Sequence, residues 1–332
     1  MDKNFDDFLN KFKKEEVIEY PNYLDSIDPL VSVIVPTFQH VDFISECLNS
    51  IISQKTDFSY EIILGDDEST DGTREICIKF AEKYKNKVRL FFHSSANNIK
   101  VNGKRTGRFN LIFGLYKAKG KYIAICEGDD FWTDADKLQN QVDFLEENTE
   151  YGVCFHKAEE RNTLNGSVSK FIPDIKTDTI YTITDYIFEN KTATCSMMFR
   201  REKLFPLFES FYYVPFGDLS IILTVMLKSN QQTFVMEKCM SVYRIHSGGM
   251  HGALQKDSKS LIKAYLLHLN FFELYSKTIL SENRFRRTIA QKIRLTYKTI
   301  KHLHYLNRNY LLYSVYYLKE LMIRIRIKYL IK

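Results

Sequence analysis

Two kinds of segment are missing from this chain, and each absence excludes a class of protein. The first 20 residues, MDKNFDDFLNKFKKEEVIEY, carry charges of both signs and contain no apolar core, so they are not a signal peptide. No apolar run approaches the roughly 18 residues that a spanning helix needs. The uncharged stretch from Asn309 to Leu318 is among the longest. We therefore expect a chain that does not cross a bilayer.

Paired cysteines are also missing. The chain has no Cys-x-x-Cys pair and no histidine at zinc spacing from a cysteine, which argues against a structural zinc site. The six cysteines lie far apart, mostly among apolar neighbours, as expected of reduced core residues in a cytosolic protein. They are Cys47, Cys77, Cys126, Cys154, Cys195 and Cys239.

Glycine is absent where a dinucleotide-binding enzyme would need it. The first β-branched run, Val31 to Val35, is followed by Pro36-Thr-Phe-Gln-His and not by a G-x-G-x-x-G turn, which disfavours a dinucleotide-dependent oxidoreductase. A phosphatase with an aspartyl nucleophile would carry its paired acids after the first strand, whereas Asp129 and Asp130 follow the fourth.

Hydrophobic residues make up 45% of the chain and aromatic residues 14%, which excludes a disordered protein. Apolar periodicity alternates between strand and helix, and three successive strand-helix units predict a parallel, right-handed α/β sheet. The expected strands are 31–35, 61–64, 88–92 and 122–126, and the expected helices are 43–52, 69–84 and 109–118. Beyond residue 130 we expect helices at 137–147 and 219–227 and strands at 152–156, 194–199 and 235–244.

The C-terminal 80 residues, 253–332, contain neither glycine nor proline, so we expect them to be helical. Only Ile323 to Lys328 alternates with period two, which is typical of a strand. From Arg284 onward the chain has thirteen Lys and Arg and one acid, Glu320, which is a net charge of +12. Since the whole chain has a net charge of +6, residues 1–283 carry about −6. We predict three regions: an N-terminal helical extension (1–28), a main domain (29–252) and a basic aromatic helical region (253–332).

Acidic residues follow two of the predicted strands. Strand one ends in Pro36-Thr37-Phe38, strand two in Gly65-Asp66-Asp67 and strand four in Glu127-Gly-Asp129-Asp130. Open parallel sheets bind ligands at the carboxyl ends of their strands. Clustered carboxylates there suit Mg²⁺ or Mn²⁺ together with phosphate oxygens, so the pattern favours a nucleoside diphosphate ligand. The alternative is that these acids are solvated loop residues or helix caps.

The stretches VSVIVPTFQH, EIILGDDESTDGT and KGKYIAICEGDDFW, in that order, resemble family 2 glycosyltransferases of the GT-A fold. The resemblance implies a Rossmann-type, mostly parallel mixed α/β sheet flanked by helices, here with a helical C-terminal extension. It also implies an inverting transfer of a sugar from a nucleotide-sugar donor, a UDP-sugar, to a hydroxyl of a glycan or lipid-linked saccharide acceptor in cell-surface polysaccharide synthesis.

By this resemblance, Pro36, Thr37 and Phe38 would line the base and ribose pocket. Asp66 or Asp67 would hydrogen-bond the base, and Arg105 and Arg108 would face the donor's phosphates. The family's commoner pattern places an Arg-Asn pair closer to the following Gly-Leu, so this stretch departs from it, and ordinary surface arginines are the alternative. Asp129 would contact the donor and, with Asp130, hold a Mn²⁺ or Mg²⁺ ion.

Two later segments extend the resemblance to about residue 250. Phe216-Gly-Asp218-Leu resembles the acceptor-side motif whose carboxylate is the catalytic base, and Tyr243-Arg-Ile-His246 resembles a loop whose histidine reaches the metal or the diphosphate. The alternatives are that Asp218 caps a helix beginning at Leu219 and that His246 is a loop histidine without a ligand.

The basic aromatic region has two interpretations. Amphipathic basic segments bind anionic membrane interfaces, where lipid-linked acceptors are presented, and this predicts a cytoplasmic protein that is peripheral on the inner face of the cell membrane. Alternatively, these helices pack on protein and their charges are solvated. Nucleic acid is disfavoured because no binding module accompanies the charge. A nucleotidyltransferase of related fold, or a catalytically silent glycan-binding module, remains open as another function.

Overall fold

A computed structural model describes residues 3–20, 28–101, 103–163, 170–248, 257–278 and 283–329. The chain divides into two compact units. The first comprises Met1–Ile183, Lys191–Leu207 and Ile221–Arg244, and the second comprises Thr184–Asn190, Phe208–Ser220 and Ile245–Lys332. The predicted boundary at residues 252 and 253 lies outside the described residues.

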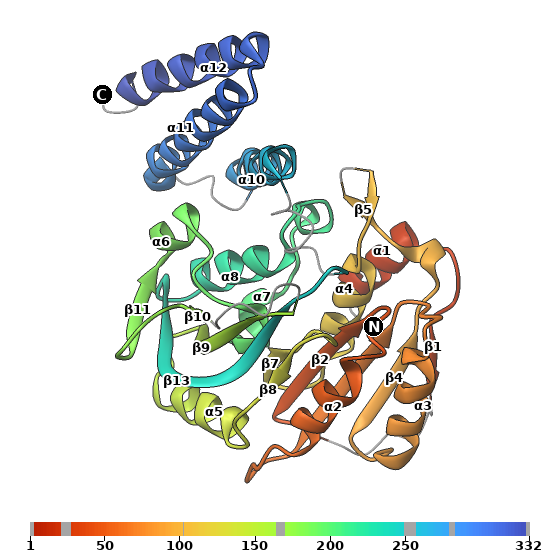
Figure 1. Cartoon of the computed structure of the whole chain (residues 1–332). Helices are drawn as coiled ribbons and strands as arrows, with labels where there is room; N and C mark the ends of the chain where they lie inside the picture. Colours follow the sequence, from red (N-terminus) through yellow and green to blue (C-terminus); the bar gives the residue numbers. More distant parts are fainter. Residues whose placement is uncertain are drawn as a thin grey trace. The chain divides into compact units, whose positions relative to one another are not determined.

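Four parallel strands form the centre of the first unit (Figure 1). Their order is β4-β3-β2-β7, so the chain adds strands on one side of β2 and then returns to add β7 on the other. This reversal places the topological switch point, where ligands bind in open α/β sheets, between β2 and β7. The strands are β2 (Val31–Thr37), β3 (Tyr60–Asp66), β4 (Val88–Phe92) and β7 (Tyr122–Ile125).

Alternate residues of β2 face different helices, as a strand's period of two requires. Val33 and Val35 belong to one hydrophobic cluster with the apolar side of α2 (Ile44–Ile52). Ile34 faces the other way, because a Cβ on Gly114 of α4 would lie 2.9 Å from its Cγ2 atom. The helices α2 and α3 (Thr73–Lys83) therefore cover one face of the sheet and α4 (Arg108–Lys117) covers the other.

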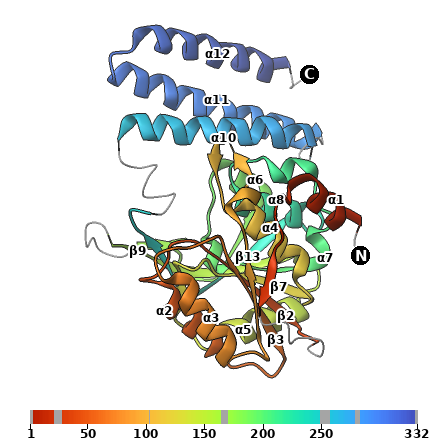
Figure 2. The same ribbon diagram turned by 90° about the vertical axis from the view of Figure 1, so that its right-hand side faces the viewer.

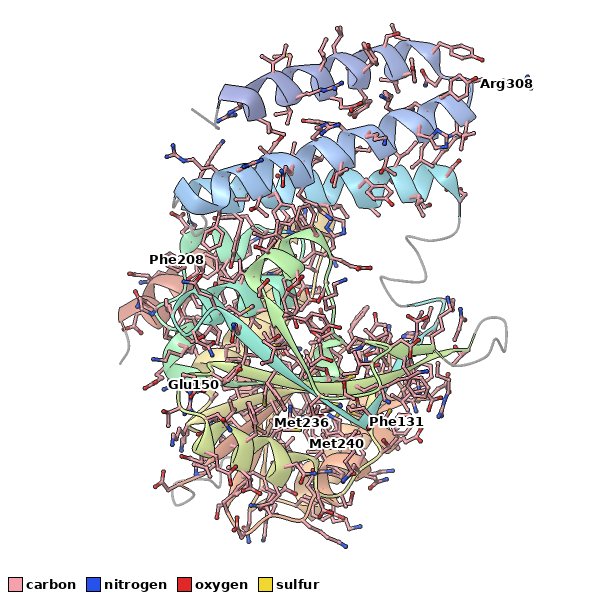
Figure 3. The ribbon with its side chains drawn as sticks, turned by 90° about the vertical axis from the view of Figure 1, so that its left-hand side faces the viewer. Phe131, Glu150, Phe208, Met236, Met240 and Arg308 are labelled. Carbon is pink, nitrogen blue, oxygen red and sulfur yellow. The ribbon has the colours of Figure 1, made fainter. Side chains whose placement is uncertain are left out.

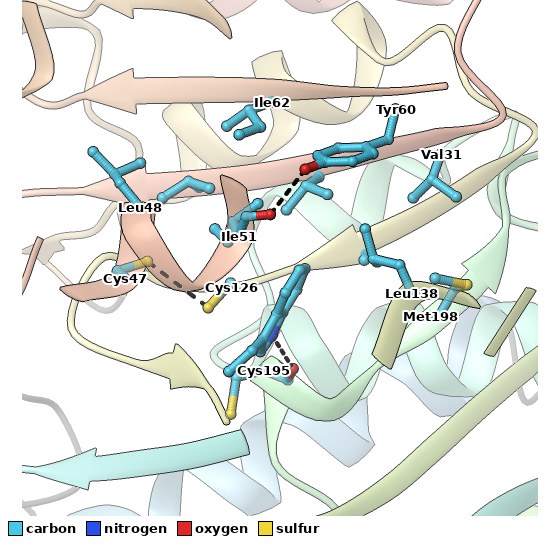
Figure 4. Close-up of a cluster of buried hydrophobic side chains, with 14 of the residues drawn as sticks. Val31, Cys47, Leu48, Ile51, Tyr60, Ile62, Cys126, Leu138, Cys195 and Met198 are labelled. Atoms are coloured by element: carbon cyan, nitrogen blue, oxygen red, sulfur yellow. Dashed lines mark hydrogen bonds between the residues drawn. The ribbon is translucent and has the colours of Figure 1, made fainter. Parts of the chain in front are cut away.

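Two aromatic side chains of this core place their polar atoms on backbone carbonyls. The Tyr60 hydroxyl donates to the carbonyl oxygen of Ile51 at 3.1 Å, and Trp132 Nε1 donates to the carbonyl of Cys195 at 3.0 Å (Figure 4). Five of the six cysteines are buried and all six are free thiols, which confirms the predicted reduced core cysteines; Cys239 is half-buried. A core of this density holds the strand ends in fixed positions.

The remaining strands extend the sheet on both sides with antiparallel pairs, so the predicted mixed sheet is confirmed and its parallel part is the central four strands. Eleven described strands follow the order β1-β4-β3-β2-β7-β12-β9-β13-β11, with β10 paired to β9 and β8 paired to β13. They are β1 (Ile18–Tyr20), β8 (Phe131–Trp132), β9 (Val153–Asn162), β10 (Lys170–Ile172), β11 (Thr179–Thr182), β12 (Met198–Arg200) and β13 (Gln232–Ile245). A separate ribbon pairs β5 (Lys100–Val101) with β6 (Lys104–Arg105).

Short helices connect these strands. They are α1 (Lys3–Phe12), α5 (Lys137–Glu147), α6 (Ile183–Phe188), α7 (Arg201–Leu204) and α8 (Gly217–Leu227), with 3-10 turns at η1 (Ser95–Asn97), η2 (Thr194–Ser196) and η3 (Glu209–Tyr212). The predicted strand at 194–199 is wrong in its first half. The hydroxyl of Ser196 and its backbone N–H both donate to the carbonyl of Ala193, which closes a turn, and only β12 joins the sheet.

The C-terminal region is helical, as predicted. It contains α10 (Ser258–Thr278), α11 (Asn283–Leu306) and α12 (Tyr310–Tyr329), and the three run side by side (Figure 2). The alternation at 323–328, although typical of a strand, does not form one, and the predicted helix is confirmed there: these residues belong to α12, where Ile323 packs in the cluster with α10 and α11 and Ile325 is exposed. None of the described helices combines the length and apolar character needed to span a membrane.

Candidate active site

Backbone hydrogen bonds bring the three predicted strand ends together at the switch point. The N–H of Asp67 donates to the carbonyl of Thr37, and the N–H of Gly128 donates to the carbonyl of Pro36, each at 3.0 Å. Gly128 has no room for a side chain, since a Cβ there would lie 2.5 Å from Thr37 Oγ1 and 2.8 Å from His40 Nδ1. The close approach explains why glycine precedes the acidic pair.

Three carboxylates converge after β7. One oxygen from each of Glu127, Asp129 and Asp130 lies within 4.8 Å of the others, which is close enough for a single cation to bind all three. Asp129 Oδ2 also lies 3.7 Å from His40 Nε2. The sequence predicts that Asp129 and Asp130 act together, but it assigns no role to Glu127 or His40. Glu127 lies just before the acidic pair and His40 lies just after Thr37, and these positions could have indicated both residues.

Asp130 is a fully buried acid with one oxygen left over. Its Oδ1 accepts a hydrogen bond from the backbone N–H of Arg244 at 2.8 Å, and its Oδ2 has no hydrogen-bond partner in the part of the chain that the structure describes. Burial, followed by the charges of Asp129 and Glu127, raises its pKa well above the ordinary value. An ionised carboxylate in this position requires a compensating positive charge, which a divalent cation would provide.

Arg244, near the end of β13, holds the acidic loop in place. Its Nη1 donates to the carbonyl of Asp129 at 2.7 Å, and its guanidinium also bonds Glu46 of α2. The same guanidinium lies 4.3 Å from the ring centre of Phe131 and 5.2 Å from that of Phe43. Backbone and side chain of one residue thus fix two consecutive acids. Sequence reasoning did not assign Arg244, although it lies two residues before the predicted His246.

The two acids after β3 have different environments. Asp66 is fully buried, and its Oδ2 accepts a hydrogen bond from Arg74 Nε at 2.6 Å, so this carboxylate is occupied in an ion pair. No cation pairs with Asp67 among the side chains that the structure describes, and its pKa is raised to about 7 by burial first and then by the charges of Asp66 and Glu68. The side-chain amide of Asn98 lies 3.2 Å from one Asp67 oxygen, with its nitrogen as the fitting donor. Of the two, Asp67 is the better candidate for binding a ligand.

The predicted phosphate-binding arginines also lie near this edge. Arg105, in β6, is exposed, and its charge helps to lower the pKa of Glu68, after hydrogen bonds from Ser95 and the charge of Arg74. Arg108 is the first residue of α4 and is buried. Phe38 is 52% exposed, so its ring is free to cover a ligand next to buried Thr37.

Asp218 and His246 belong to the second unit. Helix α8 begins at Gly217, one residue before Asp218, so Asp218 is not the N-cap of this helix, in contrast to the alternative interpretation. Its Oδ2 accepts a hydrogen bond from Asn190 Nδ2 at 2.9 Å. His246 is buried and follows the last residue of β13. That these two residues face the acidic cluster remains a prediction.

Comparison with the sequences of known protein families assigns this chain to a family. The sequence model of Glycosyl transferase family 2 matches residues 32–205. The chain belongs to this family. The matched range contains every site residue predicted before Asp218, and therefore both Gly-Asp-Asp segments of the family 2 domain.

Individual relatives agree. An uncharacterized protein of Mycobacterium bovis is 28% identical over 69% of this chain and 62% of its own length, so the chain spans about three fifths of such relatives. The putative teichuronic acid biosynthesis glycosyltransferase TuaG of Bacillus subtilis is 33% identical over 36% of this chain and 43% of its own. Among solved structures, the mannosyltransferase PcManGT of Pyrobaculum calidifontis, in complex with GDP-Man and Mn²⁺, superposes with a TM-score of 0.51, at 17% identity, over 99% of this chain and 92% of its own. This likeness confirms the GT-A fold predicted for the family 2 domain.

Proposed function

We propose that this chain transfers a sugar, with inversion, from a nucleoside-diphosphate sugar to an acceptor hydroxyl. The observation that carries the proposal is the buried Asp130, whose second oxygen has no partner in the described chain, in a group of three carboxylates at the switch point. Membership of family 2 supports the reaction class, and PcManGT combines a nucleotide-sugar with Mn²⁺ on the same fold.

A divalent cation fits the acidic group. Glu127, Asp129 and Asp130 supply hard oxygen ligands at one point, as Mg²⁺ and Mn²⁺ prefer, and Arg244 fixes the orientation of two of them. When bound, such an ion neutralises the charge that develops on the departing nucleoside diphosphate. We include His246 among its ligands, since two trans peptides keep its Cα within about 7.6 Å of that of Arg244.

The strand ends supply the donor pocket. In this proposal Pro36 and Thr37 form its floor, Phe38 covers the base, and the Asp67 carboxylate accepts a hydrogen bond from a ring N–H of the base. A uracil imide offers such a donor, in line with the predicted UDP-sugar. Arg105 and Arg108 would bind the diphosphate; Arg105 has the exposure that direct contact requires, whereas Arg108 would act from the first turn of α4.

Asp218 is the proposed catalytic base. An acceptor hydroxyl is a poor nucleophile at neutral pH, so a carboxylate must take its proton as the new glycosidic bond forms. The hydrogen bond from Asn190 holds one Asp218 oxygen in place and so fixes the orientation of the carboxylate. Attack from the side opposite the diphosphate then inverts the anomeric carbon without a covalent intermediate.

The test measures donor binding and turnover separately. Calorimetry with UDP, GDP and dTDP, with and without Mn²⁺, should show Mn²⁺-dependent binding of one of them, and a panel of the matching nucleotide-sugars then identifies the sugar. Asp218→Asn should leave the dissociation constant of the donor within about two-fold and lower kcat at least about 100-fold. Glu189→Gln, an exposed acid beside Asn190, is the matched control and should keep kcat.

Several outcomes would contradict the proposal. Equal nucleotide affinity with and without Mn²⁺ would contradict the proposed metal site. A retained anomeric configuration in the product, measured by NMR, would contradict an inverting mechanism with Asp218 as base. Release of pyrophosphate from a nucleoside triphosphate would reveal a nucleotidyltransferase. Binding of a nucleotide-sugar without transfer or hydrolysis would indicate a silent module.

For the acceptor we propose a glycan or lipid-linked saccharide in cell-surface polysaccharide synthesis, at the cytoplasmic face of the cell membrane. The name of the TuaG relative, a putative teichuronic acid biosynthesis enzyme, supports the polymer class.

A further inference from the structure

Helix α12 carries two apolar stripes, and only one of them is covered. Tyr316 and Ile323 pack on the cluster that α10 and α11 form around Ile262, Leu269, Tyr297 and Ile300. A second stripe, spaced at four, three, four and three residues, is exposed along the whole helix. Its members and their exposed fractions are Leu311 (77%), Val315 (39%), Leu318 (59%), Met322 (70%) and Ile325 (48%). This second stripe is called the outer stripe.

Helical geometry separates the two stripes by roughly 130° around the axis, at 100° per residue. The side chains of α12 on the side away from α11 accordingly project outward (Figure 3). Single exposed leucines are ordinary, but five exposed apolar residues in line form a continuous patch, and such patches mark interaction sites.

The charges around the outer stripe have one sign. Lys319 and Arg326 lie along one margin of the stripe, about 60 to 80° around the axis from its centre, and both are exposed. Arg324 is also exposed but lies on the far side of the helix, about 140° from the stripe. Glu320, the one acid of the sequence after residue 283, lies on the covered side, where Lys301 Nζ at 2.6 Å and Arg294 Nε at 3.7 Å neutralise it. The exposed face of α12 is therefore apolar along its centre and cationic along one margin.

This charge pattern decides between two occupants. A second copy of α12 packed antiparallel on the outer stripe would bring its cationic margin against the same margin of the first copy, which is unfavourable. An anionic lipid surface accepts the apolar stripe among its acyl chains and the flanking Lys and Arg among its head groups. We infer that the outer stripe of α12 binds an anionic membrane surface, with the helix lying in the interface plane.

The inference rests on the proposed function in one respect: membrane binding would bring the active site to lipid-linked acceptors. Binding itself is independent of the donor. The experiment therefore uses the full chain without nucleotide, and vesicles of phosphatidylcholine with 30% phosphatidylglycerol, in co-sedimentation at about 0.1 M salt. The parent should pellet with these vesicles and stay in the supernatant with pure phosphatidylcholine.

Two variants place the contact on the outer stripe. Leu318→Glu should lower the partition coefficient at least about ten-fold, because it puts a charge at the centre of the stripe. Lys319→Gln with Arg326→Gln should lower it about 25-fold, roughly five-fold for each cation. Leu295→Glu is the matched control, since Leu295 of α11 is 47% exposed against 59% for Leu318, and it should pellet like the parent. Circular dichroism verifies that each variant is folded.

Other results would overturn the inference. If Leu318→Glu and Leu295→Glu pelleted equally, the outer stripe would not be the contact. If the parent sedimented as a dimer without lipid and Leu318→Glu as a monomer, the stripe would be a protein interface. Turnover on a water-soluble acceptor separates this test from that of the proposed function, since Leu318→Glu should leave such turnover unchanged.

Discussion

The same tripeptide, Gly-Asp-Asp, lies at the carboxyl ends of β3 and β7, the two strands that flank β2, and takes two different structures. At the end of β3, the first acid of the pair, Asp66, is buried against Arg74, and the second, Asp67, has no cationic partner among the described side chains. After β7, the second acid, Asp130, is buried, with one oxygen bonded to the Arg244 backbone and the other without a partner among the described residues.

The difference lies in what compensates the buried charge. An arginine side chain completes the first pair from within the protein, which makes Asp66 a structural residue. In the second pair Arg244 bonds the loop through its backbone N–H and through the Asp129 carbonyl, and its guanidinium goes to Glu46. Among the described residues, the buried Asp130 carboxylate thus receives a backbone N–H but no guanidinium, which fits a cation from outside. The Gly-Asp-Asp segment at β3 therefore stabilises the fold through Asp66, and the one after β7 is the proposed metal site.

The largest effect that would test this contrast is expected at Asp130. Asp130→Asn should lower kcat about 10⁴-fold, about 5.5 kcal/mol, because the variant loses an anionic metal ligand. Its thermal unfolding without metal should be no earlier than that of the parent, since the substitution replaces a buried carboxylate whose Oδ2 has no partner among the described residues.

Asp136→Asn, an exposed acid outside the group, controls for a general loss of negative charge. Should Asp130→Asn unfold several degrees earlier while its remaining folded fraction kept full turnover, Asp130 would be structural and the contrast with Asp66 would disappear.

A second, smaller effect is expected at Asp67 and depends on pH. Its folded pKa of about 7 lies above the ordinary 3.8, so the folded protein loses stability as pH rises from 3.8 to 7. Asp67→Asn should therefore raise the free energy of unfolding by up to about 4 kcal/mol at pH 8 and by little at pH 4. Urea titrations at both pH values measure the difference.

The same variant should bind the donor about ten-fold more weakly at pH 8, because an amide oxygen is a poorer acceptor than a carboxylate. A gain in stability with a loss of affinity is the expected signature of a ligand-binding acid. Equal stability of variant and parent at both pH values would show that the Asp67 charge is compensated in the folded protein.

Much of this arrangement could be predicted from sequence. Runs such as Val31 to Val35 and the helical spacing after them specify the α/β core through short-range periodicity, and they place both acidic pairs at strand ends. Periodicity is ambiguous where tertiary contacts decide: Ile323 to Ile327 alternates like a strand, but it lies in α12, and Ile323 packs on the helices α10 and α11.

The division of labour within each acidic pair could not be predicted. It depends on Arg74, eight residues beyond Asp66, and on Arg244, 114 residues beyond Asp130. Local pattern carries no information about a partner so distant in the chain, and Arg244 has no motif of its own. Likewise, the basic tail could be identified as amphipathic, but only the packing of Tyr316 and Ile323 reveals which side of α12 remains exposed.

The smallest expected effect has the opposite sign to that at Asp67 and concerns its neighbour. Asp66→Asn should lower the free energy of unfolding by about 2 kcal/mol, because it leaves Arg74 without its buried partner. Arg74 is partly exposed and water can replace part of the interaction, which keeps the loss below that of a fully buried pair. Urea unfolding at pH 8 measures it, and Arg74→Met with Asp66→Asn should recover part of the loss. A stabilising Asp66→Asn would make both acids after β3 alike and would contradict the structural role of this pair.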